Sequence, residues 1–153
     1  MDEATAKKYV EDISKSIAEY GWFCQGVQGD GKDPDWCYTI GLTRSYRHPE
    51  LCIFGLKTES RLQILANIVG VIKEGKTFKA GDEVIDIVKK YSLAFRDVPL
   101  ATYEKYFGVG VRFNNWQSFE MLQVFWPDHA GLFPWEDGFE EGFRYAQPQL
   151  WRD

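Results

Sequence analysis

The sequence has little of what would place it in several large classes of protein. No apolar run approaches the ~20 residues that a helix needs to cross a bilayer. No block of Lys and Arg is longer than two residues, and the formal net charge is −5. Nucleic-acid binders normally concentrate positive charge on one face. We therefore expect no membrane insertion and no nucleic-acid partner.

Cysteine and histidine are scarce, with three cysteines and two histidines in the chain. Neither C-x-x-C nor H-x-x-x-H spacing occurs, so the sequence predicts no metal site and suggests no cofactor. The charged N-terminus, MDEATAKKYVEDI, lacks the apolar core of a signal peptide. We therefore expect a cytoplasmic protein in which Cys24, Cys37 and Cys52 are reduced and buried. Cys37 also has no basic neighbour in the sequence that would activate it as a nucleophile.

The common catalytic loops are missing as well. The run Gly108-Val109-Gly110 lacks the third glycine and the strand-to-helix context of a phosphate-binding loop.

The sequence does have a strong apolar content: 44% of its 153 residues are hydrophobic and 16% are aromatic, which excludes disorder for most of the chain. A chain of this length fits one domain, residues 1–153, with its own core. The rings predict an aromatic core, with a stacking or ligand pocket as the alternative.

Hydrophobic periodicity predicts an α+β domain with a mostly antiparallel sheet of about five to six strands, packed with two to three helices. The loop QGDGKDPD favours a hairpin between the first two strands. Residues 83–89 suit a helix turn or a strand, and their β-branched residues favour the strand. The expected helices cover about residues 3–20, 59–74 and 100–113, and the expected strands cover 22–27, 36–42, 51–56, 83–89, 92–98 and 119–126.

Two short segments contain the candidate catalytic residues. In His48-Pro49-Glu50, the proline keeps His48 extended, so an imidazole and a carboxylate lie at the mouth of a strand. Asp128-His129 follows Pro127 at the end of another strand. A histidine satisfied in a turn and an acid that caps backbone N–H groups are the structural alternatives. If the strands over 51–56 and 119–126 are neighbours, His48 and Asp128 would share one rim of the sheet. The candidate acid, base or orienting groups are therefore His48, Glu50, Asp128 and His129.

Four segments together resemble one known family. They are Gly21-Trp22, YTIGL at 38–42, HPELCIFGL at 48–56 and QVFWPDHAGLFPWEDGF at 123–139. In this order they resemble the bacterial and phage proteins grouped as domain of unknown function 4262, over roughly residues 20 to 150. The resemblance implies a single domain and brings no activity or cofactor with it. It also emphasises a set of positions, namely His48, Glu50, Trp126, Asp128 and Trp135.

The residues favour a binding module for a small molecule or a protein partner, because many motif-like residues occur without a complete catalytic set. One alternative is a hydrolase or transferase in which His48 or His129 is the base and Asp128 or Glu50 orients it. Another is a defence, counter-defence or immunity-type protein, which the phage members of the family suggest. Its acidic surface would suit a basic protein partner. The expected ligand-binding residues are Tyr38, His48, Trp126, Asp128 and Trp135.

Overall fold

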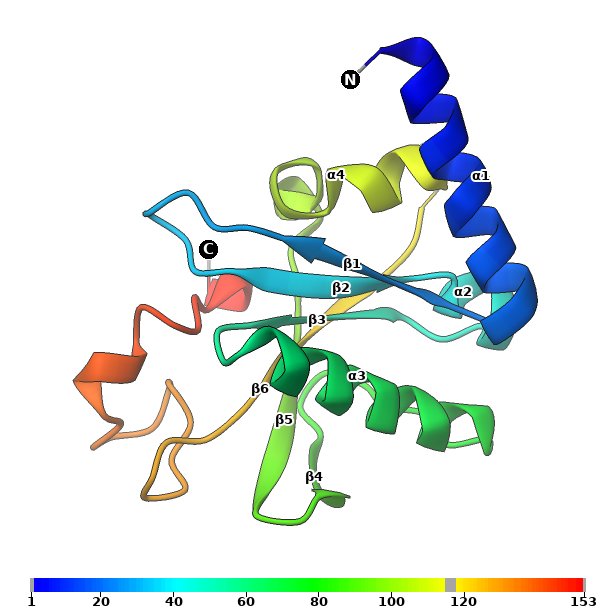
Figure 1. Ribbon diagram of the computed structural model, residues 1–153. Helices are drawn as coiled ribbons and strands as arrows, with labels where there is room; N and C mark the ends of the chain where they lie inside the picture. Colours follow the sequence, from blue (N-terminus) through cyan, green and yellow to red (C-terminus); the bar gives the residue numbers. More distant parts are fainter. Residues whose placement is uncertain (1, 115–117, 153) are drawn as a thin grey trace.

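The computed structural model describes residues 2–114 and 118–152. Its centre is a six-stranded sheet in the order β1-β2-β3-β6-β5-β4 (Figure 1). Neighbouring strands are antiparallel except β3 and β6, which are parallel. The predicted α+β class and mostly antiparallel sheet are therefore confirmed. The strands are β1 (Phe23–Val27), β2 (Trp36–Ile40), β3 (Glu50–Phe54), β4 (Glu83–Val88), β5 (Tyr91–Asp97) and β6 (Met121–Phe125). The helices are α1 (Glu3–Tyr20), α2 (Leu42–Tyr46), α3 (Thr58–Lys73) and α4 (Tyr103–Phe113), with 3₁₀ helices η1 (Leu100–Thr102), η2 (Glu141–Phe143) and η3 (Leu150–Arg152).

Helices cover both faces of the sheet, with α1 and α4 on one side and α3 on the other (Figure 1). Side chains alternate between the two layers: Tyr38 and Phe54 pack on the α4 side, and Leu51 and Ile53 pack on the α3 side. Every residue of β2, β3 and β6 is buried. Near-continuous apolar runs are typical of strands that are covered on both faces.

The first helix has the start and end that its sequence predicts. The Asp2 carboxylate accepts a hydrogen bond of 2.7 Å from the backbone N–H of Thr5, which satisfies one of the unpaired donors of the first turn. At the other end, Gly21 has φ of 91°, the left-handed conformation that favours glycine after a helix. Ile13 anchors the apolar face of α1 in the core.

Two elements differ from the prediction. The strand expected over 36–42 ends at Ile40, because Gly41 has φ of 110° and the short helix α2 begins immediately after it. The helix expected over 100–113 begins as η1 and is kinked within α4 at Phe107, whose φ and ψ are −129° and 35°. The ambiguous segment 83–89 is the strand β4, as its β-branched residues favour.

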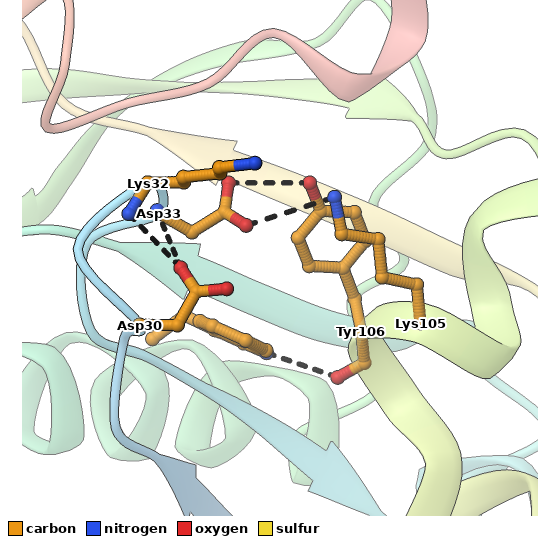
Figure 2. Close-up of polar contacts among 6 residues, drawn as sticks. Asp30, Lys32, Asp33, Lys105 and Tyr106 are labelled. Carbon is orange, nitrogen blue, oxygen red and sulfur yellow. Dashed lines mark hydrogen bonds and ion pairs between the residues drawn. The ribbon is translucent and has the colours of Figure 1, made fainter.

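The predicted hairpin connects β1 and β2, and α4 holds its loop in place (Figure 2). The Asp30 carboxylate accepts hydrogen bonds of 3.0 Å from the backbone N–H groups of Lys32 and Asp33. Asp33 in turn accepts a 3.3 Å bond from the Tyr106 hydroxyl and lies 3.7 Å from the Lys105 ammonium. The acidic loop is therefore organised by its own backbone and by one turn of α4.

Candidate functional site

Several motif residues line a cleft at the C-terminal ends of β3 and β6, which we call the Trp126 cleft. Its volume is about 570 Å³, within the range of small-molecule sites. Leu56 follows β3, and Trp126 and Asp128 follow β6. The turn between β4 and β5 reaches the same end, because β5 runs antiparallel to β6. Residues of these segments and of η2 line the cleft, among them Leu56, Lys90, Tyr91, Trp126, His129 and Phe143.

Trp126 forms a fixed wall of this cleft. Its side chain is only 6% exposed, and its ring N–H donates to the carbonyl of Phe54 at 2.9 Å. The side chain of Gln147 pairs with both backbone groups of Trp126, accepting from its N–H at 3.0 Å and donating to its carbonyl at 2.7 Å. The Phe143 ring meets the indole edge to face, with centroids 5.7 Å apart. This wall is therefore formed before any ligand binds.

Asp128 organises the loop that follows Trp126. One carboxylate oxygen accepts hydrogen bonds from the backbone N–H groups of Ala130 and Leu132, and the other accepts from Glu140, all at 2.9 Å. Burial opposes ionisation of this carboxyl, but the three N–H donors and the nearby His129 hold its pKa below the usual value. Both oxygens are thus occupied by the backbone, which suits a structural anion better than a proton acceptor.

His129 is exposed beside this loop, and its ring centroid lies 5.4 Å from that of Phe143. The exposed Lys90 also lines the cleft, together with the half-buried Tyr91, whose pKa is raised by burial. These three polar groups surround an apolar wall. The arrangement can bind a molecule that has a flat or apolar body and a polar or anionic end.

Glu50 lies at the opposite end of the same strand pair and is 1% exposed. One oxygen accepts from the Thr39 hydroxyl at 2.7 Å and from the N–H of Leu42 at 3.1 Å. The other accepts from the N–H of Thr43 at 3.0 Å and from its hydroxyl at 2.9 Å. Burial outweighs these bonds and raises the pKa of Glu50. The carboxyl group therefore caps the first turn of α2 from inside the core.

His48 is 3% exposed and has both ring nitrogens occupied. Its Nδ1 lies 2.8 Å from the carbonyl of Pro49, and its Nε2 accepts from the N–H of Phe78 at 2.9 Å. These partners require the neutral tautomer with the proton on Nδ1. Burial lowers the pKa of His48, although the Pro49 carbonyl acts in the opposite direction. The imidazole ties the start of β3 to the segment before β4.

The shared rim expected for His48 and Asp128 does not form. Their strands are neighbours, but they run parallel, with Glu50 opposite Met121 and Ile53 opposite Val124. His48 precedes β3 and Asp128 follows β6, so the two residues lie at opposite ends of the sheet. A separate cavity of about 430 Å³ lies around His48, between Arg47 and Glu120.

The other predicted binding residues are also apart. Tyr38 is 1% exposed under α4, where its hydroxyl accepts from the N–H of Gly110 at 3.2 Å and burial raises its pKa to about 12. Trp135 is half-buried and stacks on Phe133, with Arg96 4.3 Å from its ring centroid. It packs with Phe125, on the face of the sheet opposite to Trp126.

Of the predicted residues, the Trp126 cleft therefore brings together Trp126, Asp128 and His129. Sequence reasoning missed Lys90, Tyr91 and Phe143. Nothing in their local pattern marks them, because turns and loops from distant parts of the chain bring them to the cleft. Residues 2–114 and 118–152 contain no group of three or more His, Cys, Asp and Glu side chains placed to hold a metal ion.

Within the described residues, no helix combines the length and apolar character that crossing a membrane requires. Comparison with curated proteins gives no match, and comparison with solved structures gives none either. Comparison with family models matches residues 16–140, most of the chain, to the family described as "Domain of unknown function (DUF4262)". The match includes both ends of the β3–β6 pair and all four segments that carry the resemblance. The chain therefore belongs to the DUF4262 family.

Proposed function

We propose that this protein is a single-domain cytoplasmic binding module and that the Trp126 cleft holds a small molecule. The observation that carries the proposal is the pairing of a rigid aromatic wall with exposed polar side chains. Trp126 is fixed by its bonds to Phe54 and Gln147, whereas Lys90 and His129 are exposed at the same cleft. A preformed apolar surface with a few convergent polar groups is typical of ligand sites.

Binding is favoured over acid–base catalysis by the state of the candidate groups. A general base needs a lone pair within reach of the substrate. Three N–H groups occupy the Asp128 carboxylate, and Pro49 and Phe78 occupy the two nitrogens of His48. Asp128 is therefore not an orienting group for His129, because both of its oxygens are bonded to the backbone.

The ligand class follows from the charges around the cleft. The chain has a net charge of −5, yet the cleft presents Lys90 and His129, while the Asp128 carboxylate in its lining is bonded to three backbone N–H groups. Trp126 and Phe143 offer ring surface for stacking or apolar contact. We propose a small molecule with a flat or apolar body and one anionic group, held by the lysine and the imidazole.

The test compares native and denaturing mass spectra of the freshly purified full chain. We expect extra mass under native conditions only, and its value identifies the ligand. Lys90→Ala and His129→Ala should each reduce the bound fraction several-fold. Lys7→Ala removes the same charge from an exposed position on α1 and should leave binding unchanged. Equal ligand retention in Lys90→Ala, His129→Ala and wild type would contradict this choice of site.

A further inference from the structure

Two of the three cysteines lie together on the α3 side of the sheet. In the β1–β2 register Cys24 is opposite Thr39 and Gly26 is opposite Cys37, so the cysteines are diagonal neighbours on one face. Cys37 belongs to the core cluster under α3, and the partly buried Cys24 packs against that cluster. Cys52 belongs to the cluster on the other face of the sheet. A side chain built on Gly26 would meet nothing within 4 Å. The Cys24 thiol therefore has room beside it to approach Cys37.

Arg61 of α3 lies beside this pair as a buried charge with neutral partners. It is 5% exposed, and one terminal nitrogen donates to the carbonyls of Gly55 and Leu56 at 3.0 and 2.8 Å. The other terminal nitrogen donates to the Thr58 hydroxyl at 3.1 Å, and the buried Nε has no hydrogen-bond partner. Within the part of the chain that the structure describes, no carboxylate forms an ion pair with Arg61. An uncompensated buried cation is strongly unfavourable.

The Cys37 sulfur is placed to supply the missing negative charge. The neighbouring Cys24 thiol lowers the pKa of Cys37 most, burial raises it, and the charge of Arg61 acts in the same direction as Cys24. The same thiol–thiol contact raises the pKa of Cys24. Of the two thiols, Cys37 is therefore the one that loses its proton more readily.

We propose that Cys37 and Cys24 are a redox-active pair that a hydroperoxide converts to an intramolecular disulfide. The Cys37 thiolate attacks an oxygen of the hydroperoxide, the O–O bond breaks, and the leaving oxygen takes a proton from solvent. Cys37 is then a sulfenic acid. Cys24 attacks its sulfur, the S–O bond breaks, and water leaves with the proton of the Cys24 thiol. In sum, two thiols are oxidised by two electrons and one hydroperoxide is reduced.

The position of β1 at the edge of the sheet favours both the reaction with the hydroperoxide and the closure of the disulfide. Cys24 is half-buried and lines a cavity of about 340 Å³ with Trp22 and Lys73, so a small oxidant can approach the pair from the side of Cys24. Disulfide formation requires the two Cα atoms to come within about 7 Å. Diagonal neighbours lie close to that limit. Since β1 pairs with β2 alone, it can shift toward Cys37 without breaking a second strand pair.

The test exposes the full chain to hydrogen peroxide, blocks the remaining thiols and determines the intact mass and the linked peptides. We expect wild type to lose the mass of two hydrogen atoms through a Cys24–Cys37 bond that dithiothreitol reverses. Cys24→Ser should instead retain one oxygen on Cys37, which dimedone traps. In Cys37→Ser, Cys24 should stay reduced. Cys52→Ala is the control and should still form the disulfide.

Three results would overturn the proposal: three unreacted thiols in wild type, equal oxidation of Cys24 in the Cys37→Ser variant, or a disulfide that joins two chains through Cys24. The role of Arg61 is tested separately, by the rate of peroxide oxidation in two Arg61 variants. Arg61→Gln should slow peroxide oxidation about tenfold or more, because each unit of pKa changes the thiolate fraction about tenfold. Arg61→Lys should recover part of the rate. If circular dichroism shows that Arg61→Gln is unfolded, the Cys24→Ser and Cys37→Ser variants still test the proposal.

Discussion

The β3–β6 pair has a histidine and a carboxylate at each end, and the two ends use them differently. At the start of β3, His48 and Glu50 are buried and all of their polar atoms are bonded within the protein. After β6, Asp128 is also bonded to the backbone, but His129 remains exposed beside an aromatic cleft. A histidine next to an acid therefore predicts a site only where the ring is not needed by nearby backbone groups.

The physical difference is the demand for hydrogen bonds around each end. The start of α2 and the segment before β4 bring buried N–H groups to His48 and Glu50, and such groups must be paired. In the loop after Trp126, the Asp128 carboxylate accepts from three backbone N–H groups and the Glu136 carboxylate accepts from the N–H of Phe133.

The largest effect is expected from Glu50→Ala. Removal of the carboxyl leaves the N–H groups of Leu42 and Thr43 and the Thr39 hydroxyl without their acceptor. We expect the free energy of unfolding to fall by about 3 kcal/mol, measured by urea denaturation. Glu50→Gln keeps the shape and one oxygen and should lose less. A loss of under about 1 kcal/mol for the alanine variant would show that this end is not organised by Glu50.

The second prediction compares two glycines near the Trp126 cleft. Gly55 and Gly131 both have positive φ, 73° and 83°. A Cβ on Gly55 would lie 2.7 Å from the carbonyl oxygen of Ala146 and 3.0 Å from the Trp126 ring, whereas one on Gly131 would meet nothing within 4 Å. We expect Gly131→Ala to cost about 1 kcal/mol from backbone strain alone.

Gly55→Ala should cost about 1–2 kcal/mol more than that, because overpacking adds to the strain. Thermal and urea unfolding of the two variants measure the difference. Gly55→Ala should also displace the Trp126 wall and weaken ligand binding. Equal stability of the two alanine variants would show that the segment around Ala146 moves away from the added methyl group at little cost in free energy.

The third prediction concerns pH and the two histidines. Burial places the pKa of His48 in the folded protein below 6.5, so the unfolded chain binds the proton more tightly. The stability that neutral His48 contributes is therefore complete above about pH 6.5 and is lost as the pH falls toward the folded pKa. His48→Gln should remove this part of the pH dependence, measured as the urea midpoint between pH 7 and pH 5.

His129→Gln is the matched control, because it replaces the exposed histidine of the other end. It should leave that pH dependence in place. Loss of the dependence in His129→Gln rather than in His48→Gln would reverse the assignment of the structural histidine. Nuclear magnetic resonance titration of the His48 ring gives an independent measurement of its lowered pKa.

The smallest change in stability is expected from His129→Ala. The ring is exposed and contacts Phe143 at the edge of the cleft, so the free energy of unfolding should change by less than about 0.5 kcal/mol. Ligand binding should nevertheless fall. A stability loss as large as that of the Glu50 variant would mean that both ends of the strand pair are structural.

Much of the fold follows from local pattern. The first helix, the hairpin and the strands of the sheet lie near their predicted positions, because amphipathic periodicity and turn residues act within a few neighbours. The short helix α2 was missed because its first turn is capped by Glu50, a residue beyond its own end. The kink at Phe107 also has no signal beyond the glycines that follow it.

The sites were less predictable. Trp126 and Asp128 were expected among the ligand-binding residues and His129 among the candidate catalytic residues, but Lys90 and Phe143 come from other segments. Cys37 was expected to lack a basic neighbour, and in sequence it does. The fold supplies Arg61 from α3 instead. Local spacing contains no information on such distant partners.

By itself, the sequence determined the class of the domain, most of its elements and the DUF4262 family, because these depend on composition, periodicity and ordered motifs. Only the tertiary structure decided that β3 and β6 run parallel, which separates His48 from Asp128. It also decided which polar atoms are occupied, and that Cys24 and Cys37 lie beside Arg61. The physical reason is that strand direction and buried hydrogen bonds are set by long-range packing, to which each residue contributes only with its distant partners in place.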